Sequence, residues 1–302
     1  MTASPTLYDE SAPRPGSPLT GGAHLDSTAH IMNRISDQLT SQLGLVSLDG
    51  RRRPGAPALV VVAHGSRDPR ALSTVRTLLD RVRALRPGLP VHLGHIELNE
   101  PLLADTLAGL EADGTASAVL VPLLLSRGYH VGRDIPEAAA AVSVDTRVAA
   151  PLGPHPLLVD TLHARLVEAG WSTRMTDAER RGSAVVLAAA GSRDPDSAVD
   201  TRRTAQLLAA RLGVPVVPAY ATTTTPTVPT AVRALTARGR HRIAVASYFT
   251  APGRFATESA EAAPWIASAP LGTHEAMARL VLHRYDQARA IPAGTRPHLA
   301  SA

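Results

Sequence analysis

An uninterrupted apolar run at residues 58–63 predicts the first strand of a parallel sheet. A strand that is buried on both faces carries apolar side chains at every position rather than at alternate positions. Asp68 and Pro69 are typical of a helix start, as the cap and the first helical residue. Apolar residues then recur at helical spacing, at Ala71, Leu72, Val75, Leu78, Leu79, Val82 and Leu85. His64 is therefore expected at the carboxyl end of a central strand, where open α/β sheets bind their ligands.

Strand and helix patterns alternate up to about residue 169. Residues 90–96 and 118–125 predict two further strands, and a short strand is expected near Val148. Three helices are expected around them: one that starts at Pro101, one through residues 137–141, and one that ends near Ala169. Strands that alternate with helices indicate right-handed βαβ units and therefore a doubly wound parallel sheet.

The second half of the sequence repeats the first. Four segments correspond in one order and at a nearly constant offset: 184–195 with 58–69, 221–226 with 96–101, 243–261 with 119–137, and 269–274 with 150–155. We therefore expect two tandem doubly wound parallel-sheet domains that are related by internal duplication.

Composition suggests the domain boundaries. Residues 1–55 are rich in Pro, Gly, Ser and Thr and are expected to be a disordered or partly helical extension. Within them, every fourth residue is apolar at Ile31, Ile35, Leu39 and Leu43, which indicates one amphipathic helix. The first domain is expected at 56–172 and the second at 183–290, with a polar linker at 173–182 and a tail at 291–302.

Composition also excludes several classes of function. The chain has no cysteine, which excludes disulfides and thiolate metal sites, and all 31 basic residues are arginine, which excludes Schiff-base and Walker-lysine chemistry. The net charge of +5 is spread along the chain and only 3% of residues are aromatic, which argues against nucleic acid as a partner. No apolar run approaches 18 residues and no secretory signal is visible, so we expect a cytoplasmic protein without a membrane partner.

Comparison of the two halves indicates which residues serve the fold and which serve chemistry. Residues present in both halves are candidates for the fold, and residues present in one half are candidates for chemistry. Gly-Ser-Arg-Asp-Pro occurs in both halves, and His155 matches His274, so structural roles are favoured for these. Three strand-end residues of the first half are lost in the second: His64, Glu97 and His130 stand opposite Ala190, Thr222 and Arg254. Because the ends of parallel strands meet at one crevice, two imidazoles and a carboxylate there predict a site for a divalent first-row metal.

At these residues the chain resembles the class II chelatases of tetrapyrrole biosynthesis, above all the sirohydrochlorin chelatases that insert cobalt or iron. Four segments carry the resemblance within residues 58–170: 62–68, 97–101, 122–136 and 151–155. The second half resembles the family only in pattern, as in its two-domain bacterial members. The resemblance implies two chelatase-like domains with flavodoxin-like topology. It also implies a lyase in which His64 and His130 are the metal-handling and catalytic histidines and Glu97 is a metal-binding carboxylate. It also implies one active site per chain, with the second domain closing the cleft or holding the macrocycle.

The implied reaction makes few demands on the protein. Sirohydrochlorin loses two pyrrole protons when the metal binds, so a base must lie within hydrogen-bond reach of the ring centre. Imidazole can act as a base or as a metal ligand near neutral pH, and the sequence does not decide which histidine does which. The metal is a substrate, Co²⁺ or Fe²⁺ with Ni²⁺ as a third option, and no organic cofactor is expected.

The eight carboxylates of sirohydrochlorin call for arginine, which binds carboxylates in a bidentate manner. Arg127 and Arg133 flank His130 and are the first candidates, with Arg67 and Arg254 ranked behind them. The loop that carries His130 supplies three further candidate substrate contacts: Ser126, Gly128 and Tyr129.

Three other functions stay open at this point. The first is a metal or tetrapyrrole carrier that binds without turnover. The second is a phosphate- or nucleotide-binding α/β module that uses the loop after the first strand, although this loop lacks the glycine patterns of such sites. The third is a purely structural duplication. Because both halves are fused in one chain, a monomer or a weak homo-oligomer is expected, and the pathway, cobalamin or sirohaem, is left undecided.

Overall fold

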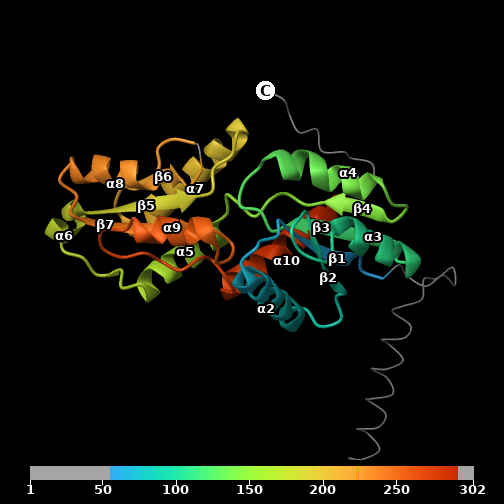
Figure 1. The fold of residues 1–302 in the computed structure, drawn as a ribbon. Helices are drawn as coiled ribbons and strands as arrows, with labels where there is room; N and C mark the ends of the chain where they lie inside the picture. The colour runs from blue at the N-terminus through green and yellow to red at the C-terminus, as the bar shows by residue number, and fades with distance from the viewer. Residues whose placement is uncertain (1–54, 223, 292–302) are drawn as a thin grey trace, which may run out of the picture. The chain divides into compact units, whose positions relative to one another are not determined.

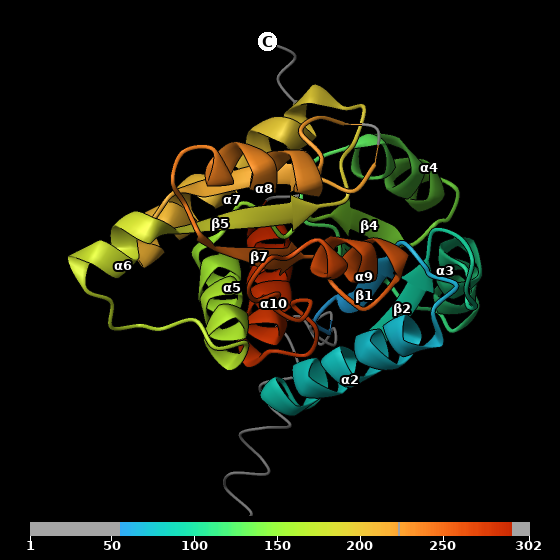
Figure 2. The same cartoon turned by 60° about the vertical axis from the view of Figure 1, so that its left-hand side comes forward.

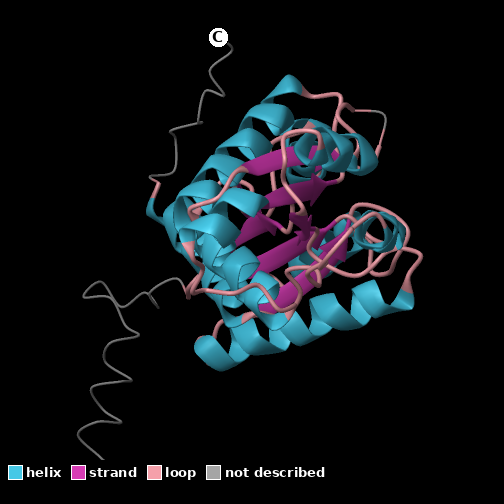
Figure 3. Cartoon of the chain, turned by 90° about the vertical axis from the view of Figure 1, so that its left-hand side faces the viewer, coloured by secondary structure: helices cyan, strands magenta, loops and turns pink. Residues whose placement is uncertain are grey.

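The computed structural model describes residues 55–222 and 224–291. The helix expected within residues 1–55, and the tail beyond residue 291, lie outside the described residues. Within the described ranges the chain forms two parallel sheets with helices on their faces (Figures 1 and 3). No helix within them is long and apolar enough to cross a membrane.

The first half contains a four-stranded sheet in the order β2-β1-β3-β4, with every pair parallel. Its elements are β1 (Ala58–Ala63), α2 (Pro69–Leu85), β2 (Val91–His95), α3 (Leu103–Ala112), β3 (Ser117–Pro122), the π-helix η1 (His130–Asp134), α4 (Ile135–Ala140), β4 (Asp145–Val148) and α5 (Pro156–Glu168). This order and direction confirm the predicted doubly wound α/β fold.

The second half repeats this arrangement with three parallel strands in the order β6-β5-β7. Its elements are α6 (Asp177–Gly182), β5 (Ser183–Ala189), α7 (Pro195–Leu212), β6 (Val216–Tyr220), α8 (Val228–Thr236), β7 (Arg242–Tyr248), α9 (Arg254–Glu261) and α10 (Glu275–Ala290). Where the first half has β4, the second has a single parallel bridge between Val245 and Ala267. The internal duplication is therefore present in the backbone as well as in the sequence.

Local capping explains where the helices begin. Asp68 and Asp194 each accept a hydrogen bond from the backbone N–H two residues later, and a proline follows each of them, as predicted. The polar segment 173–182, expected to be a linker, contains the short helix α6. Thr176 and Glu179 form a capping box there, a Thr-x-x-Glu signature that starts a helix even without an apolar stripe. The helix predicted to start at Pro101 begins two residues later, because α3 starts at Leu103.

The last helix of each half packs on the other half. Helix α5 contacts α7 and β7 of the second half, and α10 contacts α2 and β3 of the first (Figures 1 and 2). Arg86 donates two hydrogen bonds to Asp286 on α10, at 2.7 and 2.8 Å, and the Tyr285 hydroxyl donates to the carbonyl of Pro57 at 2.7 Å. One hydrophobic cluster accordingly contains buried residues of both halves. The two repeats are therefore joined through a shared core rather than through a linker alone.

Two histidines begin these exchanged helices. The Nδ1 atom of His155 accepts from the backbone N–H of Leu157 at 3.1 Å, and that of His274 accepts from Ala276 at 3.2 Å. Their matching positions in the two repeats thus have the structural role that the sequence favoured. Burial lowers the pKa of His155 to about 4, and the neighbouring Arg284 and His283 act in the same direction. His155 is therefore neutral in the folded protein at neutral pH.

We expect His155→Asn to flatten the pH dependence of stability. Between pH 6.5, the ordinary value for histidine, and about 4, the unfolded chain binds a proton at this position that the folded chain does not, so stability falls as the pH falls through this window. Asparagine keeps the helix cap and cannot titrate. Urea unfolding at pH 7.5, 6.0 and 5.0 measures the slope. His241→Asn, which removes an exposed histidine, is the control for the loss of one imidazole. Equal slopes for His155→Asn and wild type would contradict the assignment.

Candidate active site

The ends of β1 and β2 bring His64 and Glu97 together. The parallel pairing continues beyond both strands, because the N–H of Ile96 donates to Ala63 at 2.9 Å and the N–H of Glu97 donates to His64 at 3.0 Å. Gly65 has a φ of +101°, and a Cβ there would collide with the carbonyl of Glu97. The Nδ1 atom of His64 consequently lies 3.6 Å from Oε1 of Glu97.

His130 reaches the same place from the third strand. It begins the π-helix η1, and its ring centroid lies 4.8 Å from that of His64 at an interplanar angle of 88°. The Nδ1 atom of His130 lies 2.6 Å from Oδ2 of Asp134, one turn further along. With the N–H assigned to Nδ1, Asp134 accepts the hydrogen bond and Nε2 keeps its lone pair for a ligand or a proton. Asp134 was missed from the sequence, although the His-x-x-x-Asp spacing places both side chains on one helix face.

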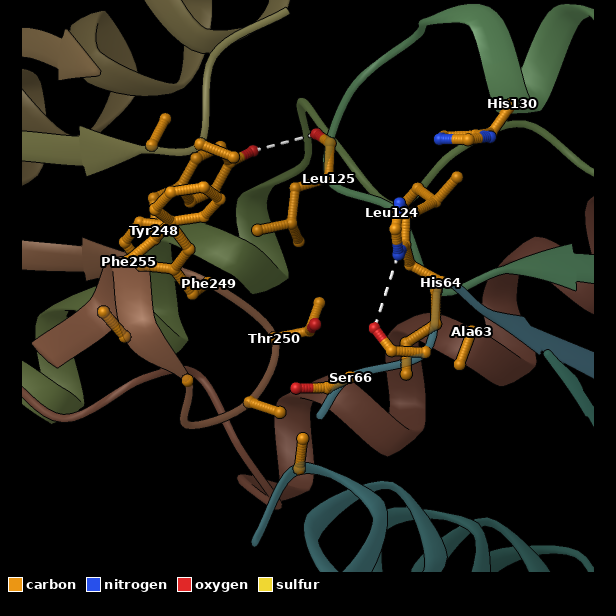
Figure 4. A pocket seen from close by; sticks show the side chains of 18 of the residues that line it. Ala63, His64, Ser66, Leu124, Leu125, His130, Tyr248, Phe249, Thr250 and Phe255 are labelled. Atoms are coloured by element: carbon orange, nitrogen blue, oxygen red, sulfur yellow. Dashed lines mark hydrogen bonds between the residues drawn. The ribbon is translucent and has the colours of Figure 1, made fainter. Parts of the chain in front are cut away.

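The two histidines line a cleft of about 1590 Å³ that both halves of the chain build. Figure 4 shows His64 and His130 on one side and Tyr248, Phe249 and Phe255 on the other. Glu97 is not among the lining residues, and 54% of its side chain is exposed beside the Nδ1 atom of His64. Within residues 55–222 and 224–291, no group of three or more histidine and carboxylate side chains is close enough to hold a metal ion. The structure therefore brings together a histidine pair, each member beside one carboxylate.

The second half has the same backbone at this place without the same side chains. The N–H groups of Ala221 and Thr222 donate to Ala189 and Ala190 at 2.9 and 3.1 Å, as those of Ile96 and Glu97 do in the first half. Thr222 therefore occupies the position of Glu97, and Ala190 that of His64. The two halves therefore share the backbone hydrogen bonds at this place and differ in the side chains that the backbone carries.

Arg127 lines the cleft, and its donors contact carboxylates of the second half. Its backbone N–H and its guanidinium donate to the Asp200 carboxylate, the latter at 2.8 Å, and the guanidinium also donates to Asp196 at 2.9 Å. Nearby, the hydroxyls of Ser126 and Ser197 lie 2.9 Å apart. These contacts attach the loop that leads to His130 to helix α7 of the second half. Arg127 therefore anchors this loop, and its role in binding the substrate stays a prediction.

The other predicted substrate contacts divide into two groups. Ser126, Gly128 and Tyr129 line the cleft, and 59% of the Tyr129 surface is exposed. Arg133 does not line it; its Nε donates to Glu137 at 2.8 Å on the exposed side of the helix.

Besides Arg127, four arginines line the cleft: Arg67, Arg70, Arg193 and Arg254. Arg67 and Arg193 belong to the repeated Gly-Ser-Arg-Asp motif, which sequence reasoning treated as structural because both halves contain it. The fold places both copies of the motif on one cleft. A residue kept in both repeats can therefore serve the site as well as the turn.

We expect Arg127→Met to destabilise the protein by roughly 3 kcal/mol, because it leaves the Asp200 carboxylate, whose side chain is only 7% exposed, without its charged partner. Urea unfolding measures the change. Arg133→Met is the matched control: it removes an ion pair between two side chains that are each 62% exposed, and is expected to cost less than about 1 kcal/mol. Equal losses of stability in the two variants would contradict the role of Arg127 as the partner of the nearly buried Asp200.

Comparison with known proteins connects this site to one family. A family model described as CbiX matches residues 58–169 and again residues 184–288. A sirohydrochlorin cobaltochelatase of Methanosarcina acetivorans is 27% identical over 123 residues, which are 37% of this chain and 95% of that protein. A sirohydrochlorin cobaltochelatase of Methanococcus aeolicus is 31% identical over 88 residues, 29% of this chain and 62% of that protein. A sirohydrochlorin ferrochelatase of Bacillus subtilis is 29% identical over 157 residues, 50% of this chain and 57% of that protein.

Solved structures show the same fold. SirB from Bacillus subtilis with Fe³⁺ has a TM-score of 0.63 and 22% identity, with 78% of this chain and 96% of that chain covered. CbiX, the terminal enzyme for biosynthesis of siroheme in denitrifying bacteria, has a TM-score of 0.58 and 18% identity, with 78% and 100% covered. The similarity extends over both halves of the described chain.

Proposed function

This chain belongs to the CbiX family, and from that membership we propose that it is a sirohydrochlorin chelatase, a lyase that inserts Co²⁺ or Fe²⁺ into the macrocycle. The observation that carries the proposal is the pair of imidazoles 4.8 Å apart on the wall of the cleft. Relatives named for cobalt and for iron both match this chain, so both metals are proposed as substrates. Ni²⁺ as a third metal, and the absence of an organic cofactor, stay predictions from the sequence.

The two histidines have different partners, which suggests different roles. The hydrogen bond to Asp134 holds the ring of His130 and directs Nε2 away from that carboxylate. A carboxylate at Nδ1 also stabilises the positive charge that an imidazole gains with a second proton. We therefore assign His130 as the base that takes up pyrrole protons.

His64 is assigned to the metal. Its Nδ1 atom lies near both the carbonyl of Gly65, at 3.3 Å, and the carboxylate of Glu97, at 3.6 Å. The exposed Glu97 carboxylate offsets the charge of an incoming hydrated cation, and the cation then passes to His64. Because few side chains of the protein hold the ion, it can leave for the four nitrogens of the macrocycle.

Both walls of the cleft come from one chain, which supports a monomeric enzyme. The carrier function is the second candidate, because a protein that only binds the macrocycle would need the same cleft. The cytoplasmic location inferred from the sequence stays a prediction.

Turnover decides between chelatase and carrier. We expect purified protein mixed anaerobically with sirohydrochlorin and Co²⁺ or Fe²⁺ to change the absorbance of the macrocycle over many turnovers. Loss of a general base lowers a rate by about 10²–10⁴-fold, and we expect His130→Ala and His64→Ala to fall in that range. His241→Ala, an exposed histidine away from the cleft, is the control and keeps wild-type activity. Stoichiometric binding without turnover would establish the carrier, and no binding would refute both.

Asp134→Asn tests the role given to His130. Asparagine can still accept a hydrogen bond from Nδ1 but has no charge, so we expect kcat to fall by about 10–100-fold while KM for the macrocycle stays within twofold. Glu137→Gln is the matched control on the following helix, since its carboxylate contacts only the exposed Arg133 in the described structure. Wild-type kcat in Asp134→Asn would remove Asp134 from the mechanism.

A further inference from the structure

The segment after β7 occupies the place in the second half that the His130 loop occupies in the first. Strand β7 pairs with β5 as β3 pairs with β1. Helix α9 starts at Arg254, and η1 starts at His130, the residue that corresponds to it in the repeat. Both segments line the same cleft from opposite halves. Arg254 is therefore a cationic side chain at the position of a histidine assigned to chemistry.

Both phenylalanines of the 302-residue sequence lie in this segment. Phe249 and Phe255 correspond to Leu125 and Val131 in the first half, so the second half has exchanged aliphatic side chains for aromatic ones. Both line the cleft and are half-buried, which leaves part of each ring open to it. Phe249 also packs against the core of its own half, and Figure 4 shows it beside Phe255 on the wall across from His64. This wall of the cleft is therefore aromatic where the first half is aliphatic.

The guanidinium of Arg254 lies over this aromatic surface. Its Cζ atom is 4.7 Å from the centroid of Phe255, within the range of a cation–π contact. The Arg254 side chain is 75% exposed, and its one ion pair among the described residues, with Glu258, has an N–O distance of 3.8 Å. Such an exposed and long pair contributes little and leaves the guanidinium available to another carboxylate. The nearby Asp194 is already engaged as the cap of α7.

We propose that Phe249, Arg254 and Phe255 form the surface of the second half that binds the macrocycle. A flat tetrapyrrole with carboxylates at its edge fits this surface in two ways: its ring packs on the phenyl groups, and one carboxylate receives the guanidinium hydrogen bonds. The assignment rests on the proposed function. In this assignment the histidines of the first half carry out the reaction, and the second half binds the macrocycle.

Equilibrium binding of metal-free sirohydrochlorin, followed by the quenching of its fluorescence, tests this surface apart from the reaction. Hydrogen bonds between charged groups contribute to the free energy of binding. We therefore expect Arg254→Gln to raise Kd and KM for the macrocycle about tenfold, with kcat within about twofold of wild type. Phe255→Val and Phe249→Leu insert the residues of the first half at the same positions, and about fivefold weaker binding is expected for Phe255→Val. A porphyrin with fewer carboxylates should bind more weakly to the wild type and lose less affinity in Arg254→Gln.

The controls separate binding from chemistry. Arg279→Gln removes an exposed arginine with the same i,i+4 pairing to a glutamate, but outside the cleft, and is expected to bind as wild type. The double variant His64→Ala/His130→Ala is expected to keep a Kd within about threefold of wild type while losing turnover. Wild-type affinity in both Arg254→Gln and Phe255→Val would overturn this inference alone. Failure of the wild type to bind sirohydrochlorin would instead overturn the proposed function, and this surface with it.

Discussion

The exchange of terminal helices between the repeats is the constraint on which the rest of the described structure depends. Helix α5 packs on α7 and β7 of the second half, and α10 packs on α2 and β3 of the first, so one face of each sheet belongs to a hydrophobic cluster that both repeats build. Apolar side chains such as Leu162 and Met277 are removed from water only when both halves are in place. This shared burial fixes the two strand-end loops across one cleft. The packing of the shared core therefore determines the geometry of a site between the repeats.

The duplication gives this cleft two walls with the same backbone and different side chains. The loop after each central strand is held by the same backbone hydrogen bonds to its neighbour, through Glu97 in one half and Thr222 in the other. Because the frame does not depend on the side chains at these positions, the side chains can change without loss of the fold. One wall presents two imidazoles, and the other presents phenyl groups and a guanidinium. Reaction and binding can then be served by separate halves of a single polypeptide.

The second half also holds the loop that leads to His130 in position. The Tyr248 hydroxyl donates to the carbonyl of Leu125 at 3.0 Å, and Arg127 is anchored on Asp200 a few residues before His130. Asp200 is nearly buried, so its charge requires this partner. The histidine therefore depends for its position on residues of a repeat that contributes no histidine to the cleft wall within residues 55–222 and 224–291. The second repeat therefore helps to position the histidine that we propose as the base.

The sequence by itself determined the local elements, the duplication and the candidates for chemistry. Apolar runs and helical spacing report burial and periodicity, and comparison of the repeats singled out His64, Glu97 and His130. Only the tertiary structure decided which arginines face the cleft, that Arg127 is an internal anchor, and that the last helices are exchanged. Those outcomes depend on contacts between residues far apart in the sequence, such as Arg127 with Asp200. No local pattern encodes such contacts, because complementarity between distant side chains exists only after the chain has folded.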